Sequence, residues 1–401
     1  MKVRLWGVRG STPTPEKRNW RYGGNTSCIE VRLDNGTIII LDCGSGLRAL
    51  GKSILGEFGD RPVEAHFFLT HFHWDHIQGI PFFLPLYKKG NSFLFHSVLH
   101  QSAELRQAIE GQMTNPYFPV EMSTMGAKRH FADLGDAPTD LNGAVIRTAP
   151  LNHPQGCVGY RIEADGCVFV LATDTEPGSP VHDRSVRELA RGGDLLVYDS
   201  QYTPHQLEGE RKGWGHSSWR EGVRIAQEQG VKRLVLFHHD PDSDDARVDS
   251  LVAAARQEFP CTTGGAEGIE FHLNTGEVNP GSSSTGIGLR SEPRYRVELP
   301  LRLTWRGPDG KSKEARGVTQ DLSKSGIYFI APDDLSLGQK LGMELVIPDE
   351  ITHHGDLCIP LDAVPVRHES LESSPEEEKP RLGVGARLDL PIDTLPPGKK
   401  T

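Results

Sequence analysis

The stretch LTHFHWDHIQGIPFF, from Leu69 to Phe83, places four potential metal ligands within six residues, directly after an apolar run. In an extended segment alternate side chains share a face, so His71 and His73 point the same way. Asp75 and His76 begin a turn that can bring them to a second point nearby. Imidazole and carboxylate ligands favour zinc, iron or manganese over calcium, and a shared carboxylate can hold two ions together. The stretch therefore predicts a site for two metal ions at the end of a buried strand.

A site for two metal ions needs further ligands, and other strand-like runs end in suitable residues. His153 lies in LNHPQGCVGY, Asp174 in VLATDTEPG, and both His238 and His239 lie in LVLFHHDP. Each of these residues alone is a weak signal, because isolated histidines usually have only a structural role.

Length and charge limit the classes of protein. A chain of 401 residues exceeds what one hydrophobic core usually serves, so two domains are expected. The net charge of −10 argues against binding of long nucleic acid through phosphate contacts, but small anionic ligands remain compatible with it. The six cysteines form no C-x-x-C pair, which fits a reducing compartment, and no run is long enough to span a bilayer. We therefore expect a cytoplasmic protein without membrane partners.

A change in composition divides the chain. From Asn274 to Arg296, Gly, Ser and Pro replace periodic apolar residues, as is typical of a linker. Before it, strand-like runs alternate with helical stretches, which predicts a layered α/β architecture. After it, short alternating strands follow one another, which predicts a small antiparallel β-barrel. We predict domains at residues 1–273 and 289–395, joined by a linker at 274–288.

The H-x-H-x-D-H motif and the later histidines and aspartate, in this order, resemble the metallo-β-lactamase fold hydrolases, in particular the branch of ribonuclease Z and related phosphodiesterases. The resemblance covers residues 1–273 and implies a four-layer αβ/βα sandwich. It implies that Asp174 bridges two metal ions, and that His238 is a ligand in preference to His239. The ligand sets that it implies for the two ions are His71, His73 and His153 for one, and Asp75, His76 and His238 for the other.

Two further motifs resemble the same branch. Asp199 in LLVYDSQY matches an acidic residue after a strand, and His216 in GWGHSSWREG matches a glycine-histidine-serine motif. An aspartate beside a histidine favours the protonated ring, which suits donation of a proton to a leaving oxygen. Alternatively, His216 and Ser217 only cap the next helix. The predicted catalytic residues are His216, Asp199 and Asp75, the last also as a metal ligand.

Asp42 in IIILDCGSG resembles the buried aspartate that orients metal ligands in this fold, or is simply a turn residue before Gly44. The segment Arg106–Met122 either overhangs the site or packs between helix and sheet.

Two divalent ions, zinc in preference to manganese or iron, would lower the pKa of a water and offset the charge of a phosphodiester. The chain lacks the basic arm that ribonuclease Z relatives use for transfer RNA, and it lacks the cysteine-rich zinc site of cyclic phosphonate phosphodiesterases. A small cyclic nucleotide or related diester is therefore the expected substrate. The alternative is a non-hydrolytic metal-bearing sensor or interaction protein. A homodimer is left open.

The second half carries two paired motifs. Arg290 and Arg294 have R-x-x-x-R spacing, and Asp321, Ser323 and Gly326 have D-x-S-x-x-G spacing. Together they resemble the PilZ domain, and the resemblance implies cyclic di-GMP as a regulatory ligand. Two arginines can contact phosphates and stack on guanine, while a polar loop with a glycine approaches the base edges. Alternatively, the arginines are ordinary linker charges and the second motif is a turn.

Overall fold

The computed structural model divides into two compact units, Met1–Gly288 and Leu289–Thr401, which are described separately. The described residues are 1–98, 102–135, 137–280, 294–295, 298–307, 311–323, 326–332, 335, 338–348, 357–371, 381–388 and 399–400. None of the helices among these residues combines the length and apolar character that crossing a bilayer requires.

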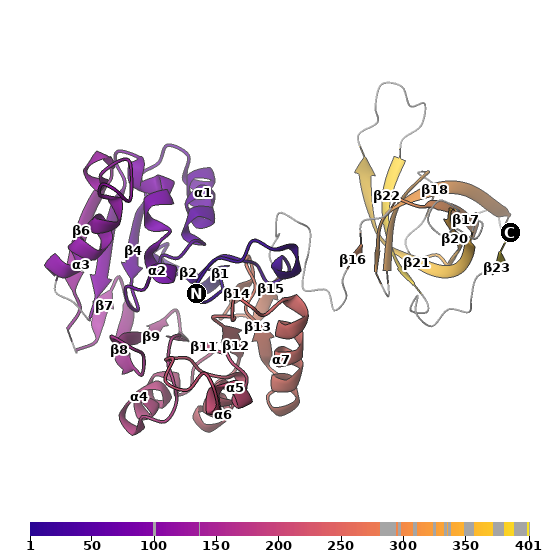
Figure 1. Ribbon diagram of the computed structural model, residues 1–401. Coiled ribbons are helices and arrows are strands. Elements are labelled where there is room, and N and C mark those ends of the chain that lie inside the picture. Colours follow the sequence, from indigo (N-terminus) through magenta and orange to yellow (C-terminus); the bar gives the residue numbers. More distant parts are fainter. Residues whose placement is uncertain are drawn as a thin grey trace. The chain divides into compact units, whose positions relative to one another are not determined.

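Two mixed sheets form the centre of the first unit (Figure 1). The first sheet has the order β15-β14-β1-β2-β3-β4-β5-β6, and the second has the order β13-β12-β11-β10-β9-β8-β7. The strands of the first sheet are β1 (Lys2–Gly7), β2 (Cys28–Arg32), β3 (Ile38–Leu41), β4 (Glu64–Phe68), β5 (Ser92–Ser97), β6 (Lys128–Asp133), β14 (Glu270–His272) and β15 (Glu277–Asn279). Those of the second sheet are β7 (Thr139–Leu141), β8 (Ala144–Leu151), β9 (Cys157–Ala164), β10 (Cys167–Ala172), β11 (Leu195–Asp199), β12 (Leu234–Phe237) and β13 (Thr262–Gly264).

Helices cover the outer face of each sheet. The helices of the first unit are α1 (Leu47–Phe58), α2 (Trp74–Ile77), α3 (Ser102–Glu110), α4 (Pro180–Ala190), α5 (Pro204–Glu208), α6 (Trp219–Gln229) and α7 (Asp245–Glu258). Helices α1 and α3 pack on the first sheet, and α4, α6 and α7 pack on the second.

Alternation along the strands fills three cores. On β4, Phe67 joins the core under α1 and α3, while Phe68 joins the core between the two sheets. On β11, Leu196 faces the helices and Val197 faces the other sheet. Strands buried on both faces explain the continuous apolar runs in the sequence. The predicted four-layer αβ/βα sandwich is thus confirmed.

The first sheet extends into the segment predicted as a linker. Strand β15 lies within residues 274–288 and pairs with β14, with Phe271 opposite Val278. Part of that segment is therefore an edge strand, because it pairs with β14. Composition alone does not reveal this pairing.

The second unit is a closed antiparallel barrel. Six strands pair in the order β18-β17-β20-β21-β22-β19, and β19 pairs again with β18. These strands are β17 (Pro300–Arg306), β18 (Ser312–Ser323), β19 (Gly326–Pro332), β20 (Leu341–Ile347), β21 (Leu357–Leu371) and β22 (Arg381–Leu388), with the short β16 (Arg294–Tyr295) and β23 (Lys399–Lys400) at β18 and β21. Along β17, buried Leu301, Leu303 and Trp305 alternate with exposed residues and form part of the core. The predicted barrel is confirmed.

Candidate metal centre

The candidate metal centre lies where strands of both sheets end. Strands β3 and β4 run parallel, as do β10, β11 and β12, so residues that follow them gather at the carboxyl ends of the strands. Asp42 follows β3, the segment His71–His76 follows β4, Asp174 follows β10 and His238 follows β12. Asp42, Asp174 and His238 have left-handed backbone, with φ of 58°, 55° and 58°. Such conformations are costly for residues other than glycine, and they cluster at functional sites.

The first group of side chains contains three histidines. The ligand atoms of His71, His73 and His153 all lie within 4.8 Å of one another. Nδ1 of His73 is 3.1 Å from Nε2 of His153. Nε2 of His71 and Nε2 of His153 lie 4.0 and 3.8 Å from Oδ1 of Asp174.

The second group contains an aspartate and two histidines. Oδ2 of Asp75 is 3.3 Å from Nε2 of His76 and 3.2 Å from Nε2 of His238. The same two ring nitrogens lie 3.3 and 3.4 Å from Oδ2 of Asp174. The two groups have the members that the resemblance implied. The first group lies near Oδ1 of Asp174 and the second near Oδ2.

Asp174 has the geometry of a bridging ligand. Burial raises the pKa of Asp174, but the neighbouring His238 and His76 outweigh burial and hold this pKa well below its usual value. The buried Nε2 of His71 has no hydrogen-bond partner, although buried polar atoms almost always have one. The donor set and this unpaired nitrogen fit two divalent metal ions. The role of each residue as a ligand stays a prediction.

An oxygen atom holds the outward nitrogen of every histidine in the two groups. A carbonyl, carboxylate or hydroxyl oxygen at that position can accept a hydrogen bond from the outward N–H. In the neutral imidazole this fixes the ring and leaves the inward nitrogen available to a metal ion. The partners are Thr70 Oγ1 for His71 (3.0 Å), Gln155 Oε1 for His73 (3.1 Å), Asp42 Oδ2 for His76 (2.8 Å), the Gly215 carbonyl for His153 (2.8 Å) and Gln201 Oε1 for His238 (3.0 Å).

Asp42 is buried and accepts several hydrogen bonds besides its contact with His76. The backbone N–H of Thr70 donates to Oδ1 over 2.9 Å, and Ser27 Oγ donates to Oδ2 over 3.2 Å. These contacts agree with the predicted orienting role of Asp42. A simple turn residue would not need this many hydrogen bonds to its carboxylate.

His239 lies outside both groups. Its Nε2 is 2.8 Å from the carbonyl of Gly265, to which it can donate a hydrogen bond. Burial, together with the charge of Arg9, lowers the pKa of His239 to about 3. The preference for His238 therefore agrees with the geometry.

His216 and Asp199 form a pair beside the metal ligands. Nδ1 of His216 is 2.9 Å from Oδ2 of Asp199, which also accepts the backbone N–H of Asp174 over 3.0 Å. Burial lowers the pKa of His216, but the charge of Asp199 and the hydrogen bond to it outweigh burial, and the pKa rises to about 9. The N-cap of α6 is Ser218, and the Ser217 hydroxyl lies 2.9 Å from the hydroxyl of Tyr198. The capping alternative is therefore not supported.

The sequence analysis missed several residues of the site. Ser11 donates its backbone N–H to Oδ2 of Asp75 over 2.8 Å, and a side chain at Gly10 would place Cβ 2.5 Å from the His238 ring. Gln201, which contacts His238, was also missed. Proximity to other motifs is the available signal, because Gln201 stands two residues after Asp199.

A cavity of about 500 Å³ opens onto the site, which is within the range of small-molecule pockets. Its lining residues are Ser11, Phe72, His73, Trp74, Asp75, Gln155, Asp174 and His216. The segment Arg106–Met122 contributes none of them. Its Ile109, Met113 and Met122 are buried in the core on the outer face of the first sheet, which supports the packing role.

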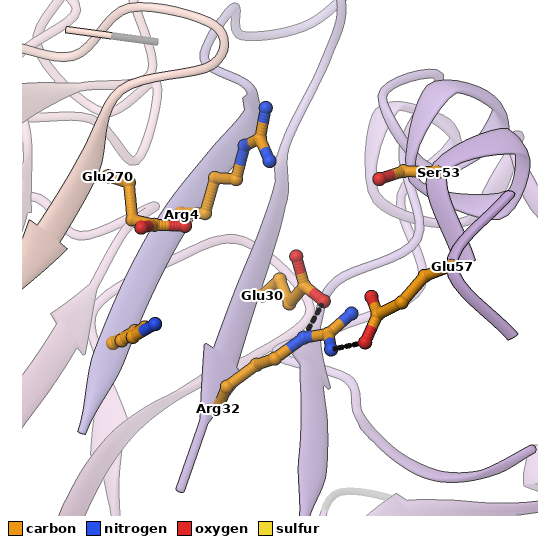
Figure 2. Close-up of a pocket in the computed structure, with 7 residues that line it drawn as sticks. Arg4, Glu30, Arg32, Ser53, Glu57 and Glu270 are labelled. Carbon is orange, nitrogen blue, oxygen red and sulfur yellow. Dashed lines mark hydrogen bonds and ion pairs between the residues drawn. The ribbon is translucent and has the colours of Figure 1, made fainter. Parts of the chain in front are cut away.

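A second hollow of about 170 Å³ lies on the outer face of the first sheet (Figure 2). It is lined by Lys2, Arg4, Glu30, Arg32, Ser53, Glu57 and Glu270. Figure 2 shows Arg32 between Glu30 and Glu57. Its Nε and Nη1 lie 2.6 Å from a carboxylate oxygen of Glu30 and of Glu57, respectively. The ion pair between Arg32 and Glu57 links β2 to α1. Because the charges that line the hollow neutralise one another, it is a poor site for a charged ligand.

The described residues of the predicted nucleotide motifs lie around one end of the barrel hairpin formed by β18 and β19. The register of β16 places Arg294 opposite Ser323 on β18. Asp321 also lies in β18, and Gly326 begins β19. The prediction of a short polar loop is thus wrong for Asp321 and Ser323, since strand pairing on both sides of β18 extends it to Ser323. Arg290 lies outside the described residues.

The fold and the paired ligand groups define the first unit as a metal-dependent hydrolase with the metallo-β-lactamase fold. A family model described as a beta-lactamase superfamily domain matches residues 37–239, about half of the chain, and the chain belongs to this family. A PilZ domain model matches residues 288–397, and the second unit is a PilZ domain.

Known relatives agree with this assignment. Ribonuclease Z of Haloarcula marismortui is 26% identical over 312 residues, which cover 65% of this chain and 92% of the relative. Ribonuclease Z of Thermoplasma acidophilum is 25% identical over 322 residues, which cover 68% and 96%. The solved structure of the metallo-β-lactamase fold protein YhfI from Bacillus subtilis has a TM-score of 0.51 at 20% identity, covering 67% of this chain and 98% of YhfI. The structural likeness supports the fold.

Proposed function

We propose that the first unit is a phosphodiesterase that uses two divalent metal ions, with zinc as the preferred metal, and acts on a small cyclic nucleotide or related diester. The observation that carries the proposal is the arrangement of five histidines, whose outward nitrogens each contact an oxygen. The inward nitrogens of four of them lie within 4.0 Å of Asp174, and that of His73 lies 3.1 Å from His153. This is a prepared site for two ions and not a chance cluster.

The residues would divide the work as follows. Asp174 would hold both ions, with His71, His73 and His153 on one side of it. Bound divalent ions supply Lewis acidity, which lowers the pKa of a water and offsets the charge of a phosphodiester. The remaining ligands, on the other side of Asp174, would be Asp75, His76 and His238.

His216 would protonate the leaving oxygen. Its Nδ1 is held by Asp199 at 2.9 Å, so Nε2 is the nitrogen that can donate. Since His216 lines the cavity, a diester bound there would come within reach of this nitrogen.

The substrate is proposed from the size of the cavity and the charge of the chain. A cavity of about 500 Å³ suits a nucleotide-sized ligand. Because relatives of this chain are named ribonuclease Z, short RNA is the substrate to compare with cyclic nucleotides. The net charge of −10 disfavours binding of a long polyanion.

The test combines metal content with hydrolysis. The full chain, freed of metal and then supplied with zinc or manganese, should bind two ions and hydrolyse cyclic mononucleotides in preference to short RNA. Asp174→Ala should remove the bridge, lower occupancy below two ions and reduce kcat/KM by more than about 100-fold, since even an outer partner of a ligand is typically worth 10- to 100-fold.

The matched control is Asp60→Ala, at an aspartate whose side chain is exposed, and it should change neither quantity. Two bound ions with full activity in Asp174→Ala would reject the bridge. Two bound ions in the wild type without hydrolysis of any diester would favour the metal-bearing sensor instead.

We also propose that the PilZ domain binds cyclic di-GMP through Arg290, Arg294, Asp321, Ser323 and Gly326. The support is the match to the PilZ family and the register that sets Arg294 opposite Ser323. The ligand would regulate hydrolysis by the first unit.

A further inference from the structure

Trp74 is the most exposed of the six tryptophans of the chain, with 76% of its surface accessible. Tryptophan is highly buried on average, so an exposed indole beside a functional cavity requires an explanation. By comparison, Trp6, Trp219 and Trp305 are buried within the cores. Trp74 has no comparable role in packing.

The backbone holds Trp74 firmly beside the candidate metal centre. It stands between His73 and Asp75, one from each ligand group, and consecutive Cα atoms are only about 3.8 Å apart. Helix α2 begins at Trp74, and its carbonyl accepts the N–H of Gln78 over 2.8 Å. The indole is therefore attached to the same short segment that would bind the scissile phosphate.

Trp74 lines the cavity together with Phe72. Phe72 packs partly against the core on the outer face of the first sheet, so this second aromatic lining residue is held in place by the core. The other lining residues are polar, among them Ser11, Gln155 and His216. A ligand that fits such a cavity has an anionic group for the metal centre and a flat aromatic group for the indole.

We infer that Trp74 is a specificity-determining residue, which stacks on the nucleobase next to the scissile phosphate. This inference rests on the proposed function and narrows the substrate to diesters that carry a base. An aromatic side chain stacks on any base, because every base has a π face. Stacking of one base is worth about 1–3 kcal/mol, which corresponds to a factor of roughly 5 to 150 in affinity.

The test compares two product-like ligands that differ only in the base. Calorimetry on the metal-loaded full chain should show AMP binding at least about fivefold more tightly than ribose 5-phosphate. Trp74→Ala should bring this ratio close to one, while Trp74→Phe should retain part of it. The control Tyr117→Ala removes another exposed aromatic residue, 75% accessible, which does not line the cavity, and should leave the ratio unchanged.

Two results would overturn the inference: equal binding of both ligands by the wild type, or an unchanged ratio in Trp74→Ala. The methyl ester of ribose 5-phosphate is a diester without a base. Its hydrolysis by the wild type therefore tests the proposed function independently of the stacking role. If the wild type hydrolyses no diester but Trp74→Ala loses the preference for AMP, the proposed function fails and the stacking role stands.

Discussion

Asp199 is the residue that connects the metal centre to the candidate proton donor. It accepts hydrogen bonds from the backbone N–H groups of Asp174 and Ser217, at 3.0 and 3.1 Å, and its Oδ2 lies 2.9 Å from His216. A single buried carboxylate therefore contacts both Asp174, the proposed bridging ligand, and the imidazole of His216. Against the effect of burial, Asp199 raises the pKa of His216 to about 9, which agrees with the proposed role of His216 as a general acid.

His216→Ala should slow different substrates unequally. Diesters with alkoxide leaving groups should lose about 100-fold or more in kcat, since general acid catalysis typically contributes that much. Nitrophenyl diesters should lose far less, because nitrophenolate leaves without a proton. Metal content should stay at the wild-type level, and replacement of the exposed His205 by alanine serves as the control. Equal losses on both kinds of diester would indicate that His216 positions the substrate and donates no proton.

At the scale of elements, the loop before α6 is held by a buried glutamate. Glu176 accepts the N–H of Gly213 on Oε1 and the N–H of Gly215 on Oε2, both over 2.8 Å. The carbonyl of Gly215 in turn contacts Nδ1 of His153 at 2.8 Å. Gly215 has φ of 83°, and a Cβ there would lie 2.4 Å from the ring of His153, so only glycine fits. Glu176 thus positions a loop that supports one ligand group.

Glu176→Gln should weaken this loop selectively. Glutamine offers one carbonyl oxygen, so one of the two loop N–H groups would face an NH₂ group and lose its acceptor. We expect the ion on the side of His153 to bind about tenfold more weakly, as for other outer partners of metal ligands, while the ion on the side of His76 keeps its affinity. Zinc titration of the metal-free chain measures both steps.

The control for this loop is Glu208→Gln, at an exposed residue of α5. Unchanged affinity for both ions in Glu176→Gln would show that the loop does not support His153. A parallel loss at both ions would point to general destabilisation.

At the scale of the whole molecule, the chain combines a hydrolase unit with a PilZ domain. A ligand of one unit can change the activity of the other only through different affinities for two arrangements of the protein. The coupling must then be reciprocal in binding free energy. Such coupling typically amounts to about 5- to 150-fold.

Cyclic di-GMP should therefore change hydrolysis by the wild-type chain, and a bound nucleotide product should change the affinity for cyclic di-GMP by a similar factor. Arg290→Ala combined with Arg294→Ala should eliminate both cyclic di-GMP binding and the response of hydrolysis. Calorimetry and hydrolysis assays on the full chain measure these effects. Unchanged affinity in the double variant would reject the site, whereas tight binding without any change in hydrolysis would reject only the coupling.

Local spacing was sufficient to predict much of this protein. His71, His73, Asp75 and His76 stand in one short segment, so their proximity follows from the geometry of the chain itself. Alternation in strands such as β17 likewise predicted the barrel, because period-two patterns depend on neighbouring residues.

Tertiary structure decided what local spacing could not. Strand β18 has the polar sequence SKEARGVTQDLS, and it is a strand because β17 and β19 pair with it on both sides. Ser11, Glu176 and Gln201 reach the site from separate segments, and each acts through a single hydrogen bond or a pair of them. Glu176 and Gln201 each stand two residues after an aspartate of the site, but nearness to a motif does not show what a polar side chain contacts. Only the meeting of distant strand ends shows it. The sequence alone indicates the ligand types and the layered fold, because both follow from local spacing and alternation. Except for Thr70, which stands next to His71, the oxygen that holds each histidine comes from a distant segment, so only the tertiary structure identifies it.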